Sequence, residues 1–398
     1  MTVPAAGDGR EDLSVAGRSI PLSLYIHVPW CLRKCPYCDF GSRPRPAALP
    51  EWAYRDALLR DLARELADLA TPRPLTSIFI GGGTPSLLSG ETIDGLLRGI
   101  RALADLAPDI EITLEANPGS ADAARFAAYR AAGVNRLSIG VQTLAAEHLA
   151  RLGRIHDPGQ ARAAVAAARA AGFANLNLDL MYGLPRQTAA DMAADIEGAI
   201  ALEPEHISYY QLTIEPDTPF GRARPPLPDE DLVADAHEAA VARLAAAGFA
   251  HYETSAFARP GRRCRHNLNY WAFGDYIGIG AGAHGKLTFA APDRVARRIK
   301  REGPEAYLAA RGHGGFASSE ERLAEDDLAL EFMLNALRLA EGFPVGLFEA
   351  RTGLPIDRLL SRLEAAERRG LLILNDGWIR PSDLGRRFLD DLLGLFVR

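Results

Sequence analysis

The segment YIHVPWCLRKCPYCDF (residues 25–40) places Cys31, Cys35 and Cys38 in the spacing CxxxCxxC. Thiolates are the soft ligands that iron–sulfur clusters prefer, and three of them on one short loop can each bind one iron of a 4Fe-4S cluster. The fourth iron then has no protein ligand from this loop. Such an open iron can chelate a small molecule through an amine and a carboxylate, which the methionine end of S-adenosylmethionine offers.

A zinc site and a redox pair are the alternative interpretations of these cysteines. Structural zinc takes four ligands, normally as two CxxC or CxxC/HxxxH pairs, and this loop does not supply them. The one other cysteine, Cys264, lies more than two hundred residues away, which argues against a disulfide framework. Free cysteines in one loop suit a reducing compartment, and no long apolar stretch is present, so the sequence predicts a soluble, cytoplasmic protein.

The length and the net charge of the chain restrict the classes of fold and function that it can have. The chain has 398 residues, 48% of them hydrophobic, and a formal net charge of -6. It can therefore bury a large core and divide into several domains. An acidic balance argues against nucleic acid as the main partner, because duplex binding depends on neutralising phosphates with basic side chains.

Strand-like and helical segments alternate between residues 22 and 212. The strand-like runs are LSLYIHV, SIFIGGG, IEITLEA, RLSIGVQ, NLNLDLMYG and HISYYQL. Six such units predict an α/β architecture, an open partial (β/α)6 barrel with its site at the carboxyl ends of the strands. Because the cysteine loop follows the first strand, the cluster is expected at that end.

Stretches rich in proline and glycine suggest that the chain divides into four parts. We expect a flexible N-terminal tail (1–20), the partial barrel (21–225), an α+β extension carrying CRHNLNYW (226–315) and a C-terminal domain (316–398). In the last part, three helical patterns precede a hairpin turn at Asn375–Gly377, an order like that of a winged helix. DNA binding is disfavoured there, since residues 320–398 hold fifteen Asp and Glu against eleven Arg.

Polar residues and glycines follow several of the predicted strands. Gly82, Gly83 and Thr84 end the second strand, and Glu115, Gln142 and Asp179 end the next three. Glycines allow a ligand to approach backbone amides, and carboxylates suit ribose hydroxyls. Each residue alone could be a helix cap or a loop anchor, but together they predict a ligand pocket facing the cysteine loop.

Seven motifs in order give the chain a resemblance to a known family. YIHVPWCxxxCxYCDF, GGGTPS, LEANPG, SIGVQ, RxH, DLMYGLP and HNLNYW resemble the oxygen-independent coproporphyrinogen III oxidase family of radical-SAM proteins. The resemblance implies a cluster on the three cysteines and S-adenosylmethionine as a cofactor. It further implies two groups of contacts around the cofactor: Tyr25 and Tyr37 packing beside it, and a pocket formed by Gly82, Gly83, Thr84, Glu115, Gln142, Arg154 and Asp179.

Two departures from the oxidase pattern favour the haem-chaperone branch of this family. Phe40 stands where the oxidases have a fourth cysteine, and only twenty-four mostly polar residues precede Tyr25. The resemblance therefore implies binding of haem and its transfer to haem-requiring proteins, with membrane-bound respiratory enzymes as candidate recipients and no assigned catalytic residue. The alternative is a coproporphyrinogen III oxidase that uses a 5'-deoxyadenosyl radical.

The HNLNYW segment is the expected haem contact. Imidazole is a common axial ligand of haem iron, so His266 is the candidate ligand, with Tyr270 and Trp271 as flat apolar surface. Nearby arginines could meet the propionates; they are Arg262, Arg263 and Arg265. An ordinary packed loop is the alternative interpretation, and Cys264, His284 and His313 are rival ligands.

Overall fold

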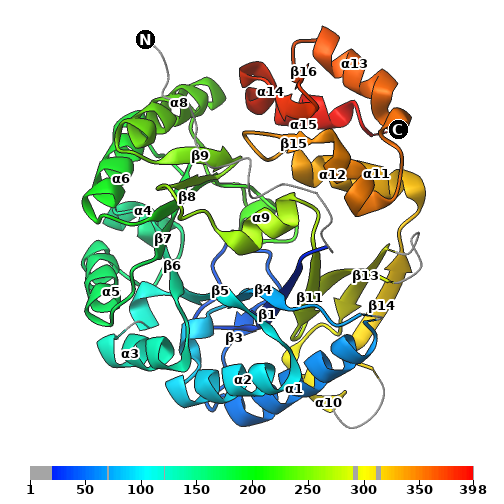
Figure 1. Cartoon of the computed structure of the whole chain (residues 1–398). Helices are drawn as coiled ribbons and strands as arrows, with labels where there is room; N and C mark the ends of the chain where they lie inside the picture. Colours follow the sequence, from blue (N-terminus) through cyan, green and yellow to red (C-terminus); the bar gives the residue numbers. More distant parts are fainter. Residues whose placement is uncertain (1–19, 70, 121, 290–294, 311–314, 398) are drawn as a thin grey trace.

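The computed structural model describes residues 20–69, 71–120, 122–289, 295–310 and 315–397. Its main feature is one curved sheet of twelve strands, in the order β14-β13-β12-β11-β1-β4-β5-β6-β7-β8-β10-β9. Helices lie around the outside of this sheet, as Figure 1 shows for α1, α2, α3, α5 and α6. The two edge strands of this described sheet, β14 and β9, are not neighbours in it, so the barrel is open.

The six predicted strands are confirmed and are parallel to one another. They are β1 Leu22–Val28, β4 Leu75–Gly82, β5 Leu106–Ala116, β6 Arg136–Gln142, β7 Leu176–Tyr182 and β8 His206–Gln211. The helices between them are α1 Glu51–Ala67, η1 Pro85–Leu87, α2 Gly90–Leu103, η2 Pro118–Ser120, α3 Ala123–Ala132, α4 Ala146–Arg151, α5 Pro158–Ala170 and α6 Ala189–Ala201. Strands and helices that alternate along the chain in this order form the partial barrel that the sequence predicts.

Local sequence signals explain where these helices begin and end. Asp157 and Thr188 cap α5 and α6 through capping boxes with Gln160 and Asp191. Gly172, just after the end of α5, is the helix stop signal in this stretch of sequence, and its φ of 83° is a conformation that glycine adopts at little cost. The buried faces of helices and strands form one large apolar core.

The segment after β8 extends the same sheet at both edges. The stretch that contains HYETSAF (251–257) forms a hairpin of β9 Ala250–Glu253 and β10 Ala256–Ala258, and β10 pairs antiparallel with β8. At the other edge β11 Asp275–Ile279 lies parallel to β1, and β12 to β14 continue antiparallel. Their bounds are β12 His284–Thr288, β13 Val295–Lys300 and β14 Ala317–Arg322. The helix α10 Pro304–Ala309 lies between β13 and β14 in the chain.

Three features of this segment differ from the sequence-based interpretation. A short helix, α7 Pro219–Arg222, lies in the proline- and glycine-rich stretch that marks the predicted boundary at residue 225, before α8 Glu230–Ala246. HNLNYW forms α9 Arg265–Trp271. β14 was not predicted because its residues ASSEER carry no apolar alternation, and it lies in the main sheet although the predicted C-terminal domain begins at residue 316. The domain boundaries stay predictions.

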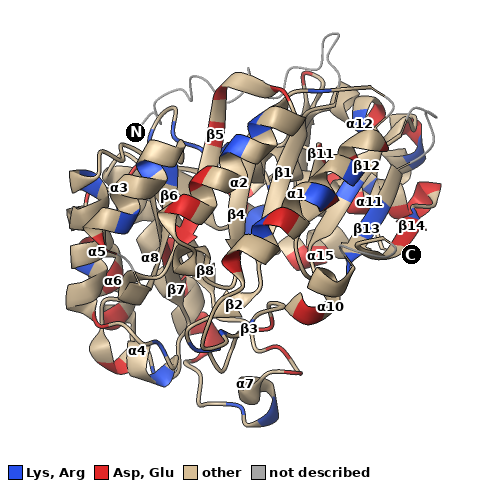
Figure 2. Cartoon of the chain, turned by 90° about the horizontal axis from the view of Figure 1, so that it is seen from below, with Lys and Arg blue, Asp and Glu red and all other residues tan. Residues whose placement is uncertain are grey.

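The C-terminal part has its own core and a small sheet in the order β15-β17-β16. Helices precede a hairpin, as predicted, and Asp376 and Gly377 both have positive φ in the turn. Its elements are α11 Glu325–Ala336, β15 Phe343–Pro344, α12 Val345–Thr352, η3 Ile356–Leu359, α13 Leu360–Arg368, β16 Leu372–Asn375, β17 Trp378–Pro381, α14 Asp383–Arg387 and α15 Leu389–Gly394. Figure 2 shows acidic and basic residues interspersed along the helices of the chain.

Candidate functional site

A cavity of about 630 Å³ lies inside the barrel, and the cysteine loop forms part of its wall. Its volume is in the range of small-molecule sites. Most of the predicted site residues line it: Cys31, Cys35, Cys38, Tyr37, Gly82, Gly83, Thr84, Glu115, Gln142, Arg154 and Asp179. Tyr25 and His266 are not among the lining residues. The fold thus brings together residues from four consecutive strands of the sheet and the turns after them, from the cysteine loop, and from the segment between α4 and α5.

The cysteine loop is held by backbone hydrogen bonds to β4. Trp30–Cys31 forms β2, which pairs with β3 (Arg43–Pro44) and closes the loop. The backbone N–H of Gly83 donates to the carbonyl of Val28 at 2.7 Å, and that of Thr84 donates to the carbonyl of Trp30 at 2.8 Å. Figure 2 shows β2 and β3 together at one end of the barrel.

The three loop cysteines are free and partly buried, as cluster ligands must be before metal binds. Burial raises the pKa of Cys38, so this thiol keeps its proton until a metal displaces it. Arg154 directs a guanidinium N–H toward Cys35 Sγ at 3.9 Å, and its buried Nε has no hydrogen-bond partner. A cation beside the thiolates fits an anionic iron–sulfur cluster.

Close packing requires glycine at the end of β4, in addition to any contact that the glycine backbone makes with a ligand. A Cβ on Gly83 would lie 2.5 Å from the Trp30 carbonyl oxygen, and one on Gly82 would lie 2.6 Å from the His27 ring. Gly82 also has a φ of 108°. Side chains here would therefore push the cysteine loop away from β4, whether or not a ligand contacts the glycine backbone.

Two carboxyl groups face the cavity from β5 and β7, on either side of β6. Glu115 lies at the end of β5 as predicted, whereas Asp179, predicted at the end of its strand, lies in the middle of β7. The N–H of Gly82 donates to Glu115 Oε2 at 3.1 Å, while burial, reinforced by the charge of Asp179, raises the pKa of Glu115 to about 8. Asp179 accepts hydrogen bonds from Ser138 at 2.9 Å and Asn177 at 2.7 Å. Burial raises the pKa of Asp179 although these bonds oppose it. Paired acids of this kind are suited to binding hydroxyl donors.

Gln142 and Tyr37 complete the wall near the cysteines. Gln142 has a φ of 68°, and its Oε1 accepts a hydrogen bond from Tyr210 at 2.9 Å. Tyr37 packs against Phe220 with ring centroids 6.5 Å apart. Tyr25 sits behind this wall, where its hydroxyl is 3.0 Å from His27 Nδ1 and its ring stacks on Phe79.

The HNLNYW segment borders the cavity through Asn267, whereas its candidate haem ligand His266 is buried and is not among the lining residues. α9 lies inside the ring of elements in Figure 1, against β4, β1 and β11. His266 is 2% exposed, with Nδ1 2.9 Å from Ser77 Oγ and Nε2 2.9 Å from the Tyr270 hydroxyl. Its ring stacks on Phe79, and burial lowers its pKa to about 3, so it is a neutral imidazole.

The other haem-contact candidates differ in their surroundings. Arg263 pairs with Glu341, and Arg265 pairs with Asp109, so neither guanidinium is reserved for a propionate. Cys264 lines the cavity, and burial raises its pKa to about 12. His284 is exposed at the start of β12, and His313 lies outside the described residues.

Sequence reasoning missed several polar residues that face the cavity from the strand interiors. They are Arg136 and Ser138 on β6, Asn177 on β7, and Ser208 and Tyr210 on β8, and together with the predicted Gln142 and Asp179 they stand at alternate positions of their strands. Successive strand residues point to opposite faces, so this alternation marks the inner face of the barrel. Polar residues at alternate positions within otherwise apolar strands were the signal that could have found them.

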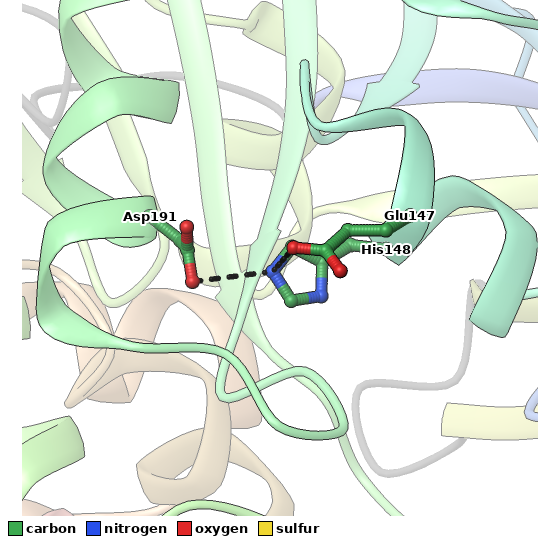
Figure 3. A group of neighbouring side chains, drawn as sticks. All are labelled: Glu147, His148 and Asp191. Atoms are coloured by element: carbon green, nitrogen blue, oxygen red, sulfur yellow. Dashed lines mark ion pairs between the residues drawn. The ribbon is translucent and has the colours of Figure 1, made fainter.

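A second cluster of possible metal ligands lies away from the cavity (Figure 3). Glu147, His148 and Asp191 bring ligand atoms within 4.8 Å of one another. However, Asp191 Oδ2 accepts hydrogen bonds from Thr188 at the start of α6, and Arg151 donates to both Glu147 and His148. These contacts account for the cluster as an anchor of helix ends, and a guanidinium beside it opposes cation binding.

Two family models match the chain: the radical SAM superfamily over residues 25–198 and the HemN C-terminal domain over residues 323–388. A heme chaperone HemW of Escherichia coli K12 is 48% identical over 378 residues, which are 95% of this chain and 98% of the relative. The chain belongs to the HemW family of radical SAM proteins. A HemW of Haemophilus influenzae is 46% identical, covering 95% of this chain and 98% of the relative.

A solved structure supports the fold assigned to this HemW-family chain. Coproporphyrinogen III oxidase (HemN) from Escherichia coli, a radical SAM enzyme, superimposes with a TM-score of 0.80 over 99% of this chain and 95% of its own. At 23% identity this likeness concerns the fold. Within the described residues of the family member, no helix is long and apolar enough to cross a membrane.

Proposed function

We propose that this protein is a haem chaperone, which binds haem and transfers it to haem-requiring proteins. The observation that carries the proposal is the near full-length similarity to proteins named heme chaperone HemW. Cytoplasmic proteins that need haem are reachable recipients, and membrane-bound respiratory enzymes are candidates among them. The cytoplasm as its compartment belongs to the same proposal.

The cavity supports a 4Fe-4S cluster and S-adenosylmethionine as its cofactors. Cys31, Cys35 and Cys38 would bind the cluster, since their thiols share one loop on the cavity wall. Glu115, with the backbone amides of the glycine-rich turn, would hold the cofactor from β4 and β5. The other proposed contacts are Thr84, Gln142, Arg154 and Asp179, with Tyr25 and Tyr37 packed behind and beside them. When bound, a reduced cluster supplies one-electron chemistry to the cofactor.

Coproporphyrinogen oxidation is the competing function. Phe40 lines the cavity at the position where the oxidase pattern has a cysteine, and 63% of its surface is exposed. An exposed phenyl ring supplies apolar surface at the cavity mouth and no ligand or proton-transfer group. This residue favours the chaperone over the oxidase.

We also propose His266 as the haem ligand, which requires a change in its hydrogen bonds. Both ring nitrogens are engaged, so ligation requires that Ser77 or Tyr270 release one of them. If His266 ligates haem, His266→Ala should shift the haem absorption spectrum, and Cys264→Ala should leave it unchanged. Unchanged spectra and affinities in both variants would place the haem ligand elsewhere.

Anaerobic reconstitution followed by two parallel assays tests the proposed function. Iron and sulfide should be incorporated, haem should bind and pass to an apo-haemoprotein, and coproporphyrinogen III should not be consumed. Turnover of coproporphyrinogen III to protoporphyrinogen by the reconstituted protein would make the oxidase assignment correct instead.

A further inference from the structure

A buried arginine without a partner lines the cavity. Arg136 is the first residue of β6 and is 2% exposed. Its Nε has no hydrogen-bond partner, and in the described part of the chain its side chain makes no ion pair. A charged group in this state costs considerable free energy, so proteins normally pair it or give it a ligand.

The acidic neighbours of Arg136 are engaged elsewhere. Glu111 accepts hydrogen bonds from the backbone N–H of Arg265 at 3.0 Å and from Cys264 Sγ at 3.6 Å. Asp179 accepts from Ser138 and Asn177. Burial lowers the pKa of Arg136, but the nearby Cys264 and Glu111 more than offset it, so the guanidinium stays charged while its N–H groups remain available.

The position of Arg136 separates it from the cluster. Arg136 begins β6 and Gln142 ends it, and six residues of strand span about 20 Å. Asn267 of the HNLNYW segment also lines the cavity, with no side-chain hydrogen bond among the described residues. The cavity therefore has the cysteine loop toward one end and a guanidinium, close to α9, toward the other.

We propose that Arg136 and Asn267 form a carboxylate-binding subsite at the end of the cavity remote from the cluster. A guanidinium fork matches a carboxylate in a bidentate way, and a carboxamide N–H adds a further donor. The carboxylate of S-adenosylmethionine belongs at the open iron, so the subsite takes a second organic anion. The inference rests on the proposed function in one respect: it assigns that anion to a haem propionate, which would enter next to HNLNYW.

Binding of two matched probes tests the subsite. Haemin carries free propionates, and its dimethyl ester does not. In the reconstituted full-length protein, Arg136→Met should weaken haemin binding about tenfold or more, as expected for loss of a charge-assisted hydrogen bond. The ester should bind wild type and variant equally. Arg98→Met, on the exposed face of α2, is the matched control and should change neither affinity.

The thermal stability of the Arg136 variants shows whether Arg136 serves ligand binding or stabilises the fold. The thermal midpoint of the haem-free variant should stay close to that of wild type, with cluster content preserved, because the Arg136 side chain makes no ion pair among the described residues and its Nε has no hydrogen-bond partner. A lower midpoint with unchanged haemin affinity would overturn the subsite. If Arg136→Met does not fold, Arg136→Lys keeps the charge but loses the fork and should still weaken haemin selectively.

Titration with a small carboxylate tests the subsite independently of the proposed haem-chaperone function. If wild type binds no haem, succinate titrated against protein with ¹⁵N-labelled arginine should still shift one guanidinium signal that Arg136→Lys lacks. That result would retain the subsite and reject the chaperone. Absence of both haemin binding and a succinate-dependent shift would reject the subsite.

Discussion

At the residue scale, the four cysteines occupy two different environments. The loop thiols are partly exposed on the cavity wall, whereas Cys264 is fully buried beside Glu111. We expect Cys31→Ala, Cys35→Ala or Cys38→Ala to abolish most iron and sulfide incorporation, because each removes one of three ligands. Cys264→Ala should retain the cluster. Iron and acid-labile sulfide analysis checks this, and cluster loss confined to the Cys264 variant would contradict the assignment.

Glu115 should make stability depend on pH. Its pKa, raised by burial to about 8, lies above that of an unfolded glutamate, so the native state binds the extra proton between about pH 4.5 and 8. The Glu115 contribution therefore lowers stability as pH rises through this window, by roughly 1–3 kcal/mol after allowance for partial exposure. Glu115→Gln should flatten the decline in thermal midpoint of the protein without S-adenosylmethionine. The exposed Glu91→Gln is the control, and an equally steep decline in Glu115→Gln would refute the prediction.

At the element scale, the contact between β4 and the cysteine loop depends on the absence of a side chain. Gly83→Ala would put a methyl group 2.5 Å from the Trp30 carbonyl, which is fixed by its bond from Thr84. We expect a loss of about 1–3 kcal/mol of stability and a reduced cluster content, because the loop must move. Gly346→Ala in α12 meets no atom within 4 Å and should be neutral or stabilising by up to about 1 kcal/mol. Denaturation and iron analysis compare the two, and equal behaviour would disprove the steric argument.

At the scale of the whole molecule, a buried ionic network joins the extension to the barrel. Lys300 on β13 lies 2.6 Å from Asp61 and 2.5 Å from Glu65 of α1, and Tyr307 also donates to Asp61. Lys300→Met should destabilise the protein by about 3–5 kcal/mol, because the buried Asp61 loses its cation and Glu65 keeps only Arg298. Arg98→Met breaks only an exposed pair and should cost less than about 0.5 kcal/mol. Similar unfolding midpoints for both variants would show that the network contributes little.

Some of this architecture could be predicted because its signals are local. The six parallel strands follow from apolar runs, the end of α5 from Gly172, and the turn before β17 from Asn375 to Gly377. The cluster loop follows from cysteine spacing alone, since three ligands within eight residues must lie close together. The sequence by itself thus determined the six barrel strands, their order and the place of the thiols at the carboxyl end of the first strand.

Only the tertiary structure decided which polar residues are satisfied. His266 became a buried imidazole because Ser77, nearly two hundred residues earlier in the chain, and Tyr270 reach its two nitrogens. Arg136 makes no ion pair among the described residues, although Glu111 and Asp179 are charged neighbours that accept hydrogen bonds from other donors. β14 joined the sheet by pairing with β13, with no apolar pattern of its own. Hydrogen-bond satisfaction and edge pairing depend on long-range neighbours, which sequence periodicity does not specify.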